Sequence, residues 1–292
     1  MAAMPLLDAD AAHAAAAQLP AVFRHVACLA ALSPEGAVAE AHAAMLARAT
    51  GARLTIYHVL DAGIGFAAER NFQVNSMTTA AERLARATLE RESRSTGIVP
   101  GRRTVLVDRG PATAATIAAG IRRLGADVAV MAPHVRGTVS RALGFSLTEA
   151  TVDYLEGGVP VLCARGEAHA YERILVATDF SPASRRSLRL AARLSALFGA
   201  AVTVLHAVAE PNAVAGALAA LRRFIPTELR VRSPLLAVEV GEPSAAILAK
   251  RDAIDADLFV LSTRGRDSLR DAVIGTHAQR VIRNAPCSVL VS

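Results

Sequence analysis

The chain of 292 residues repeats itself. The segment GARLTIYHV at residues 51–59 returns as GAAVTVLHA at residues 199–207, which places His58 opposite His206. Three further pairs of similar segments follow in the same order: residues 109–119 with 241–250, residues 126–132 with 256–262, and residues 159–164 with 285–292. Four pairs in one order indicate a duplication, so the chain is expected to fold as two copies of one unit.

The second copy begins just before the segment YERILVATDF, near residues 166–170. We therefore predict three parts, which are an Ala-rich N-terminal extension over residues 1–21, a first domain over 22–168 and a second over 169–292. Asp8 and Asp10 interrupt the extension and no basic segment precedes it, so a signal peptide is not expected. No apolar run approaches the ~20 residues of a membrane helix, and we expect a cytoplasmic protein without a membrane partner.

Short apolar runs alternate with helical segments in each copy. In the second copy a strand at 174–178 precedes a helix with Ser181 as N-cap, Pro182 in the first turn and Gly199 at its end. The pattern continues with strand 202–208, helical stretch 216–224, strand 235–240, helix 243–253, strand 258–262, helix 271–284 and strand 288–291. Strands that are apolar on both faces and alternate with helices predict the α/β class, with two tandem doubly wound domains of five parallel strands.

The positive net charge does not by itself indicate a nucleic acid partner. The formal net charge is +6, but Lys250 is the only lysine, and the arginines are scattered among acidic residues. We interpret this as a compositional bias and expect no specific nucleic acid partner. Cys28, Cys163 and Cys287 have neither metal-ligand nor redox spacing, which favours buried free thiols.

The stretch STRGRDSLRDAVIGTHAQRVI at residues 262–282 follows the predicted fourth strand of the second copy. Ligands of doubly wound sheets bind beyond the carboxyl ends of the strands, where Asp179, Ala207 and Ser262 also lie. Gly265 and Gly275 would let the backbone approach an anion closely, and Arg264 and Arg266 would add charge. These residues alone are compatible with a phosphate site or with an ordinary loop that enters a helix.

Together with ILVATDFSPAS, LHAV and GEPSAAI, this stretch resembles the tandem-domain members of the universal stress protein family, over the whole chain after about Val22. ATP-binding members of that family carry Gly-x2-Gly-x9-Gly-Ser/Thr, and this chain has Ser262-x2-Gly265-x9-Gly275-Thr276. The resemblance implies a Rossmann-like, adenine nucleotide alpha hydrolase-like fold and ATP as ligand, with or without Mg²⁺. Ser262 in place of the first glycine is expected to weaken binding without abolishing it.

The resemblance also implies a role for each matching residue. Asp179 and the backbone near Ala177 and Ala207 would hold adenosine. The ribose and phosphates would be held by Leu261, Ser262, Gly265, Gly275, Thr276 and His277. Arg264 is not part of the family pattern and is included for its charge.

The first copy departs from this pattern. Ala31 stands where the second copy has Asp179, and Ala132 and Val135 occupy the two early glycine positions. Gly137 and Gly144 are present at a different spacing. The resemblance therefore implies a first half with the fold but without the adenine nucleotide site.

The last strand of each copy is apolar and would form a sheet edge that needs covering. Members of the resembled family commonly associate through this strand. We therefore predict an intramolecular pseudo-dimer of the two halves, with Cys163 and Cys287 near its axis, and keep a homodimer of the whole chain open.

Three other patterns are weaker. The GIGFAA segment at residues 63–68 matches a dinucleotide fingerprint by letter, but a turn is the better interpretation. His58 and His206 are expected to be packed or hydrogen-bonded imidazoles rather than proton carriers. His134, Arg136 and Arg141 are interpreted as an exposed loop rather than a second anion site.

The leading hypothesis for function is a stress-response or regulatory protein that binds an adenine nucleotide. No nucleophile or general base is evident beside the predicted cradle, so an efficient enzyme is not expected. A nucleotide-free interaction module and a slow ATPase are the alternatives.

Overall fold

The computed structural model describes residues 22–61, 72–133, 147–155, 158–230, 232–263 and 275–292. The first half contains β1 (His25–Leu29), α2 (Pro34–Thr50), β2 (Arg53–Asp61), α3 (Phe72–Ser93), β3 (Arg103–Gly110), α4 (Ala114–Leu124), β4 (Val128–Met131), α6 (Leu147–Leu155) and β5 (Val161–Cys163). The second half contains β6 (Arg173–Ala177), α7 (Pro182–Phe198), β7 (Ala201–Val208), α8 (Val214–Phe224), α9 (Thr227–Arg230), β8 (Leu235–Val240), α10 (Pro243–Ile254), β9 (Leu258–Leu261), α11 (Thr276–Asn284) and β10 (Ser288–Val291).

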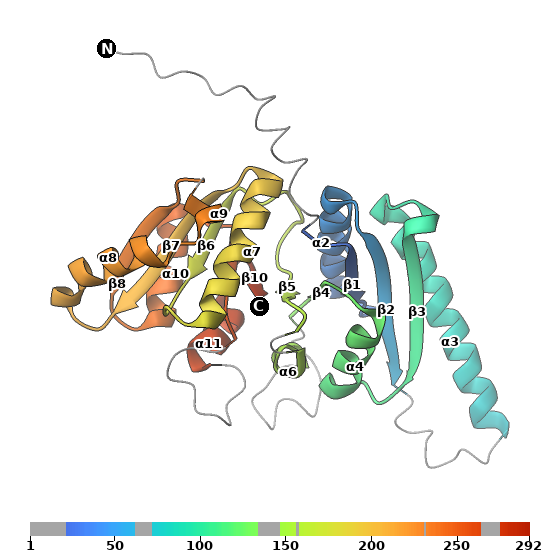
Figure 1. Cartoon of the computed structure of the whole chain (residues 1–292). Coiled ribbons are helices and arrows are strands. Elements are labelled where there is room, and N and C mark those ends of the chain that lie inside the picture. Colours follow the sequence, from blue (N-terminus) through green and yellow to red (C-terminus); the bar gives the residue numbers. More distant parts are fainter. Residues whose placement is uncertain (1–21, 62–71, 134–146, 156–157, 231, 264–274) are drawn as a thin grey trace.

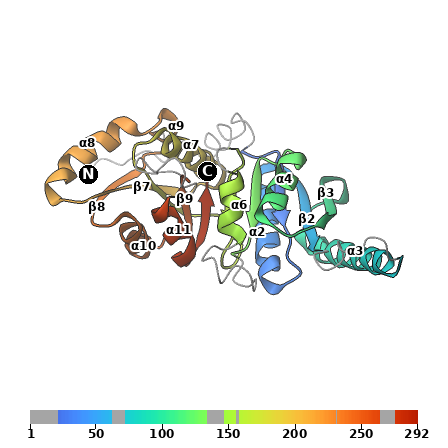
Figure 2. The ribbon, with the colours of Figure 1, turned by 90° about the horizontal axis from the view of Figure 1, so that it is seen from below.

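The ten strands form one continuous sheet with the order β3-β2-β1-β4-β5-β10-β9-β6-β7-β8. Neighbouring strands within each half are parallel, so each half is a doubly wound unit of five strands. This confirms the predicted fold class. The long crossover between the second and third strands of the first half contains α3. Figures 1 and 2 place α3 and α8 at opposite ends of the molecule.

Local sequence signals explain where the first helix of each half begins and ends. The Ser181 hydroxyl accepts the Ser184 N–H at 3.1 Å, and α7 stops at Gly199, whose φ of 72° is left-handed. In the first half Ser33 caps α2 in the same way. One predicted boundary is wrong: the helix expected over 271–284 begins at Thr276, because Gly275 is extended, with φ −62° and ψ 141°.

Two hydrophobic layers cover the sheet, one on each face. The cluster on one face includes residues of α2, α3, α7, α8 and α9, and the cluster on the other includes residues of α4, α6, α10 and α11. Most of the buried side chains are Ala, Val, Leu and Ile. Strands buried on both faces are typical of parallel sheets, as the sequence pattern predicted.

The halves are joined by their last strands. β5 and β10 pair in antiparallel register, with Leu162 opposite Leu290 and Cys163 opposite Val289. This confirms the predicted pseudo-dimer. Cys163 lies one residue from the centre of the pairing, whereas Cys287 precedes β10, and all three cysteines are free and buried.

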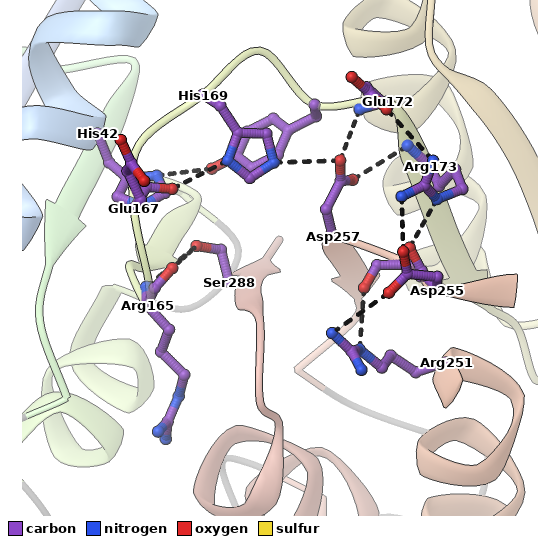
Figure 3. Close-up of polar contacts among 12 residues, drawn as sticks. His42, Arg165, Glu167, His169, Glu172, Arg173, Arg251, Asp255, Asp257 and Ser288 are labelled. Atoms are coloured by element: carbon purple, nitrogen blue, oxygen red, sulfur yellow. Dashed lines mark hydrogen bonds and ion pairs between the residues drawn. The ribbon is translucent and has the colours of Figure 1, made fainter. Parts of the chain in front are cut away.

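Polar contacts reinforce this junction. The segment between the halves donates the Arg165 N–H to Ser288 Oγ at 3.0 Å (Figure 3). Glu149 of α6 accepts two hydrogen bonds of 2.7 Å from Arg283 of α11, and its side chain is only 2% exposed. A buried carboxylate needs such a bidentate partner, so the ion pair ties α6 to α11.

Membrane insertion has no support in the described ranges, where no helix combines the length and apolarity needed to cross a bilayer.

Candidate functional site

The predicted site residues of the second half that the structure describes lie at or just beyond the carboxyl ends of neighbouring strands, or at the start of α11. Ala177 pairs with Leu205, and Val176 pairs with Val260, so the carboxyl ends of β6, β7 and β9 are neighbours. Ala207 lies two residues beyond Leu205, and Leu261 one residue beyond Val260. The strand ends therefore meet as the doubly wound topology requires.

Asp179 lies in the tight turn between β6 and α7. Its Oδ1 accepts the Ser181 N–H at 3.0 Å, which orients the carboxylate over the strand end. The Thr178 hydroxyl, which lies 2.9 Å from the Ser184 hydroxyl, also accepts the Phe180 N–H at 3.1 Å. Phe180 has a left-handed φ of 66°, uncommon for a bulky residue. The half-buried carboxylate thus accepts one backbone hydrogen bond within a turn that Thr178 also braces.

His206 supports this turn from the neighbouring strand. Its Nδ1 lies 2.7 Å from the Thr178 carbonyl oxygen, and because a carbonyl only accepts, Nδ1 carries the proton. The Phe180 ring packs against the imidazole with centroids 4.3 Å apart. His58 makes the same bond to Ala30 at 2.8 Å. Both histidines are hydrogen-bonded imidazoles, as predicted.

The start of α11 adjoins the end of β9. The Gly275 N–H donates to the Thr263 carbonyl at 2.8 Å, which joins the helix start to the end of β9. Among the described residues no side chain caps this helix at Gly275, whereas Ser181 caps α7 and Glu242 caps α10. Thr276 and His277 are exposed in the first turn. A helix N-terminus without a side-chain cap leaves N–H groups for an anion.

Glu242 is a site residue that sequence reasoning missed. Its Oε1 lies 2.6 Å from His277 Nδ1 and 3.1 Å from Arg280 Nη1, so it links the loop after β8 to α11. Its Oε2 accepts the Ser244 hydroxyl at 2.6 Å and the Ala245 N–H at 2.8 Å. The signal was present in the GEPSAAI segment, because a Glu directly before a Pro at a helix start is placed to cap that helix.

The environment of Glu242 favours the ionised form. Partial burial opposes this, but hydrogen bonds from Ser244, Ala245 and His277 outweigh it and lower the pKa of Glu242 to about 2. His277 therefore already contacts a carboxylate at the edge of the predicted phosphate site.

The remaining predicted residues are located as follows. Leu261 is buried and its carbonyl accepts the Ser292 N–H at 3.0 Å, and Ser262 is half-buried beside it. Arg264 and Gly265 lie outside the described residues. The same holds for the first-half residues Val135, His134, Arg136, Gly137, Arg141 and Gly144 and for the GIGFAA segment at residues 63–68.

Metal ligands do not cluster in the part of the chain that the structure describes, where no three His, Cys, Asp or Glu side chains converge. Mg²⁺ that entered with a nucleotide would rely mainly on phosphate oxygens and water, which is its usual mode of binding.

These features define a tandem Rossmann-like α/β protein with a candidate anion cradle in its second half. The sequence profile of the universal stress protein family matches residues 23–165 and again residues 170–292. The chain therefore belongs to the universal stress protein family, in a tandem arrangement.

Individual relatives agree with this assignment. A universal stress protein of Thermus aquaticus, from the QAH/OAS sulfhydrylase 3′ region, is 29% identical over 134 residues, which are 41% of this chain and 98% of that protein. The structure of a universal stress protein from Archaeoglobus fulgidus superposes with a TM-score of 0.68 at 20% identity and covers 92% of this chain and 96% of its own. A putative universal stress protein from Pseudomonas aeruginosa gives a TM-score of 0.62 at 20% identity and 92% of both chains. At this identity the two structures support the fold alone.

Proposed function

We propose that the second half binds an adenine nucleotide, ATP in the first place, and that the chain acts as a cytoplasmic stress-response regulator. The observation that carries the proposal is the α11 N-terminus, which no described side chain caps. The Gly275 N–H joins it to Thr263 after β9, and β9 pairs with β6, the strand that precedes Asp179. Gly275 and Thr276 stand there at the spacing of the ATP-binding motif. Membership of the family adds support.

Each residue has a role that follows from its chemistry. The Asp179 carboxylate would accept hydrogen bonds from ribose hydroxyls or the base, next to the backbone of Ala177 and Ala207. The N–H groups at Thr276 and His277 and the Thr276 hydroxyl would donate to phosphate oxygens. Ser262, Arg264 and Gly265 complete the motif in the sequence.

The same arrangement favours binding over catalysis. His206 contacts the turn that carries Asp179, and its Nδ1–H is committed to the Thr178 carbonyl. His277 is paired with Glu242 at the outer edge of the cradle. A slow ATPase remains the alternative activity, and phosphate release that disappears in an Asp179→Ala variant would establish it.

Nucleotide stoichiometry tests the proposal. Mass spectrometry of the denatured protein should identify a bound adenine nucleotide, and equilibrium dialysis with labelled ATP should saturate at about one per chain. Asp179→Ala should weaken binding by about tenfold to a hundredfold, because the nucleoside loses a hydrogen-bonding carboxylate. Asp252→Ala is the matched control, since Asp252 is 73% exposed on α10.

Two outcomes would contradict the proposal. A stoichiometry of two would mean that the first half has rebuilt a site from other residues. No binding at all would favour the nucleotide-free interaction module.

A further inference from the structure

A cleft lies at the junction of the two halves. Its volume is about 240 Å³. The wall from the first half is apolar and includes Val152 and Leu155 of α6 and Val159 before β5. The wall from the second half comes from α7, from Thr263 after β9, and from Val291 and Ser292 at the end of β10. The cleft is therefore formed only when β5 and β10 pair.

Three arginines of α7 make the second wall basic. Arg186, Arg189 and Arg193 are spaced by three and four residues, so they lie along one face of the helix and flank Leu190. Arg186 and Arg189 are exposed, and no carboxylate pairs with either among the described residues. Like charges at these spacings repel, and no acidic residue offsets them among the described residues of the lining.

The arginines are specific to the second half. α2 is the equivalent of α7 in the first half, because Ser33 and Ser181 cap the two helices and lie 148 positions apart, as His58 and His206 do. The equivalent positions of α2 hold Val38, Ala41 and Met45. The fold therefore does not require arginine at these three positions, and a chain-wide preference for arginine does not explain why α2 has none of them.

We propose that this cleft binds a small organic anion, with a carboxylate or phosphate head on the arginines and a short apolar body against Val152, Leu155 and Val159. Guanidinium groups suit both kinds of head because they offer paired donors. The volume is smaller than the ~300–1,000 Å³ of a typical drug-sized pocket, which favours a body of a few carbons.

The cleft and the proposed nucleotide site share one residue. Thr263 lines the cleft, and its carbonyl accepts the Gly275 N–H at 2.8 Å. The two sites use different sets of charged groups, so the anion proposal does not depend on nucleotide binding. The experiment must nevertheless distinguish binding in the cleft from binding at the proposed nucleotide site.

Calorimetry on the full chain with three six-carbon probes tests the proposal. Hexanoate and hexyl phosphate should bind at about one per chain, and neutral hexan-1-ol at least about tenfold more weakly, because it lacks the charge that the arginines recognise. The stronger of the two anions identifies the preferred head group. Binding should weaken as salt is raised.

Variants locate the binding. Arg186→Ala with Arg189→Ala should weaken both anions at least about tenfold, while the matched pair Arg222→Ala with Arg223→Ala, two exposed arginines of α8, should leave them unchanged. Equal binding of hexan-1-ol, no anion binding at millimolar concentration, or an unchanged affinity in the α7 pair would overturn the proposal. So would loss of hexyl phosphate binding in Asp179→Ala or under saturating ATP, since the probe would then occupy the nucleotide site.

Discussion

The two halves share a hydrogen-bond framework and differ at the turn after the first strand. Thr178 N–H donates to Leu205 O at 2.9 Å in the second half, and Ala30 N–H donates to Tyr57 O at 2.8 Å in the first. Beyond this point the turns diverge. Asp179 Oδ1 accepts the Ser181 N–H at 3.0 Å, whereas Ser33 N–H donates to the Ala31 carbonyl at 2.8 Å.

The next difference reinforces the first. Gly36 stands where the second half has Ser184, and a Cβ at Gly36 would lie 1.9 Å from the Ala31 carbonyl oxygen. In the first half the backbone thus occupies space that a side chain needs in the second. The first half therefore differs from the second by more than a carboxylate: its turn is built around a glycine, so placing Asp at position 31 alone would not reproduce the second half's geometry.

Gly36→Ser, which copies the second half, should give the largest effect. The new Cβ meets backbone rather than a flexible side chain, so the free energy of unfolding should fall by about 3 kcal/mol. Denaturant unfolding followed by circular dichroism measures it. Gly101→Ser is the control, because a Cβ at Gly101 has nothing within 4 Å. An unchanged stability would show that the turn can adopt the second half's conformation at little cost.

Gly275→Val should lower ATP affinity at least about a hundredfold, or about 2.7 kcal/mol, because the branched side chain projects where phosphate is expected to approach. The φ of −62° at Gly275 suits any residue, so the fold should be unchanged. Calorimetry on wild type and variant decides this, with Gly101→Val as control. Equal affinities in a folded variant would refute the assigned phosphate position.

Glu40→Gln should stabilise the first half at high pH. Burial and then the neighbouring Glu92 raise the pKa of Glu40 to about 7 from an ordinary 4.5, at a position where the second half has Leu188. Below pH 4.5, the ordinary pKa, Glu40 is protonated in both the folded and the unfolded state, so its burial carries no ionisation penalty. Stability falls as pH rises from 4.5 to about 7, and the penalty is then constant.

The gain from Glu40→Gln should be about 2 kcal/mol at about pH 8 and negligible at about pH 4, since the buried amide still needs hydrogen-bond partners. Thermal unfolding across this range measures it. Glu167→Gln is the control, because Glu167 is exposed in the segment between the halves. A pH-independent gain would mean that ionisation of Glu40 is not its cause.

Ser262→Gly should have the smallest effect. It restores the first glycine of the motif, and if the serine side chain merely crowds the ligand, ATP affinity should rise by about threefold to tenfold, or about 1 kcal/mol. Calorimetry beside wild type measures the change. No gain would indicate that the Ser262 hydroxyl replaces what the glycine provides.

The sequence by itself determined the repeated α/β pattern and most element boundaries, because these depend on local physics. Ser181 begins α7 and Gly199 ends it, through the preferences of their own side chain and backbone. Apolar runs predict buried strands independently of the surrounding sequence. The motif spacing from Ser262 to Thr276 was likewise visible in the sequence. So was Ala31, at the position where the second half has an aspartate. The late start of α11 was not, because Gly275 is held extended by the end of β9.

Only the tertiary structure decided which distant groups meet. Glu242 reaches His277 across 35 positions, and Glu149 reaches Arg283 across 134, distances along the chain over which no periodicity carries information. In the sequence the arginines of α7 are indistinguishable from other scattered charges. They face an apolar wall only because β5 pairs with β10. Contacts of this kind depend on how two independently patterned halves are brought together, which is a property of the packed molecule and not of any segment.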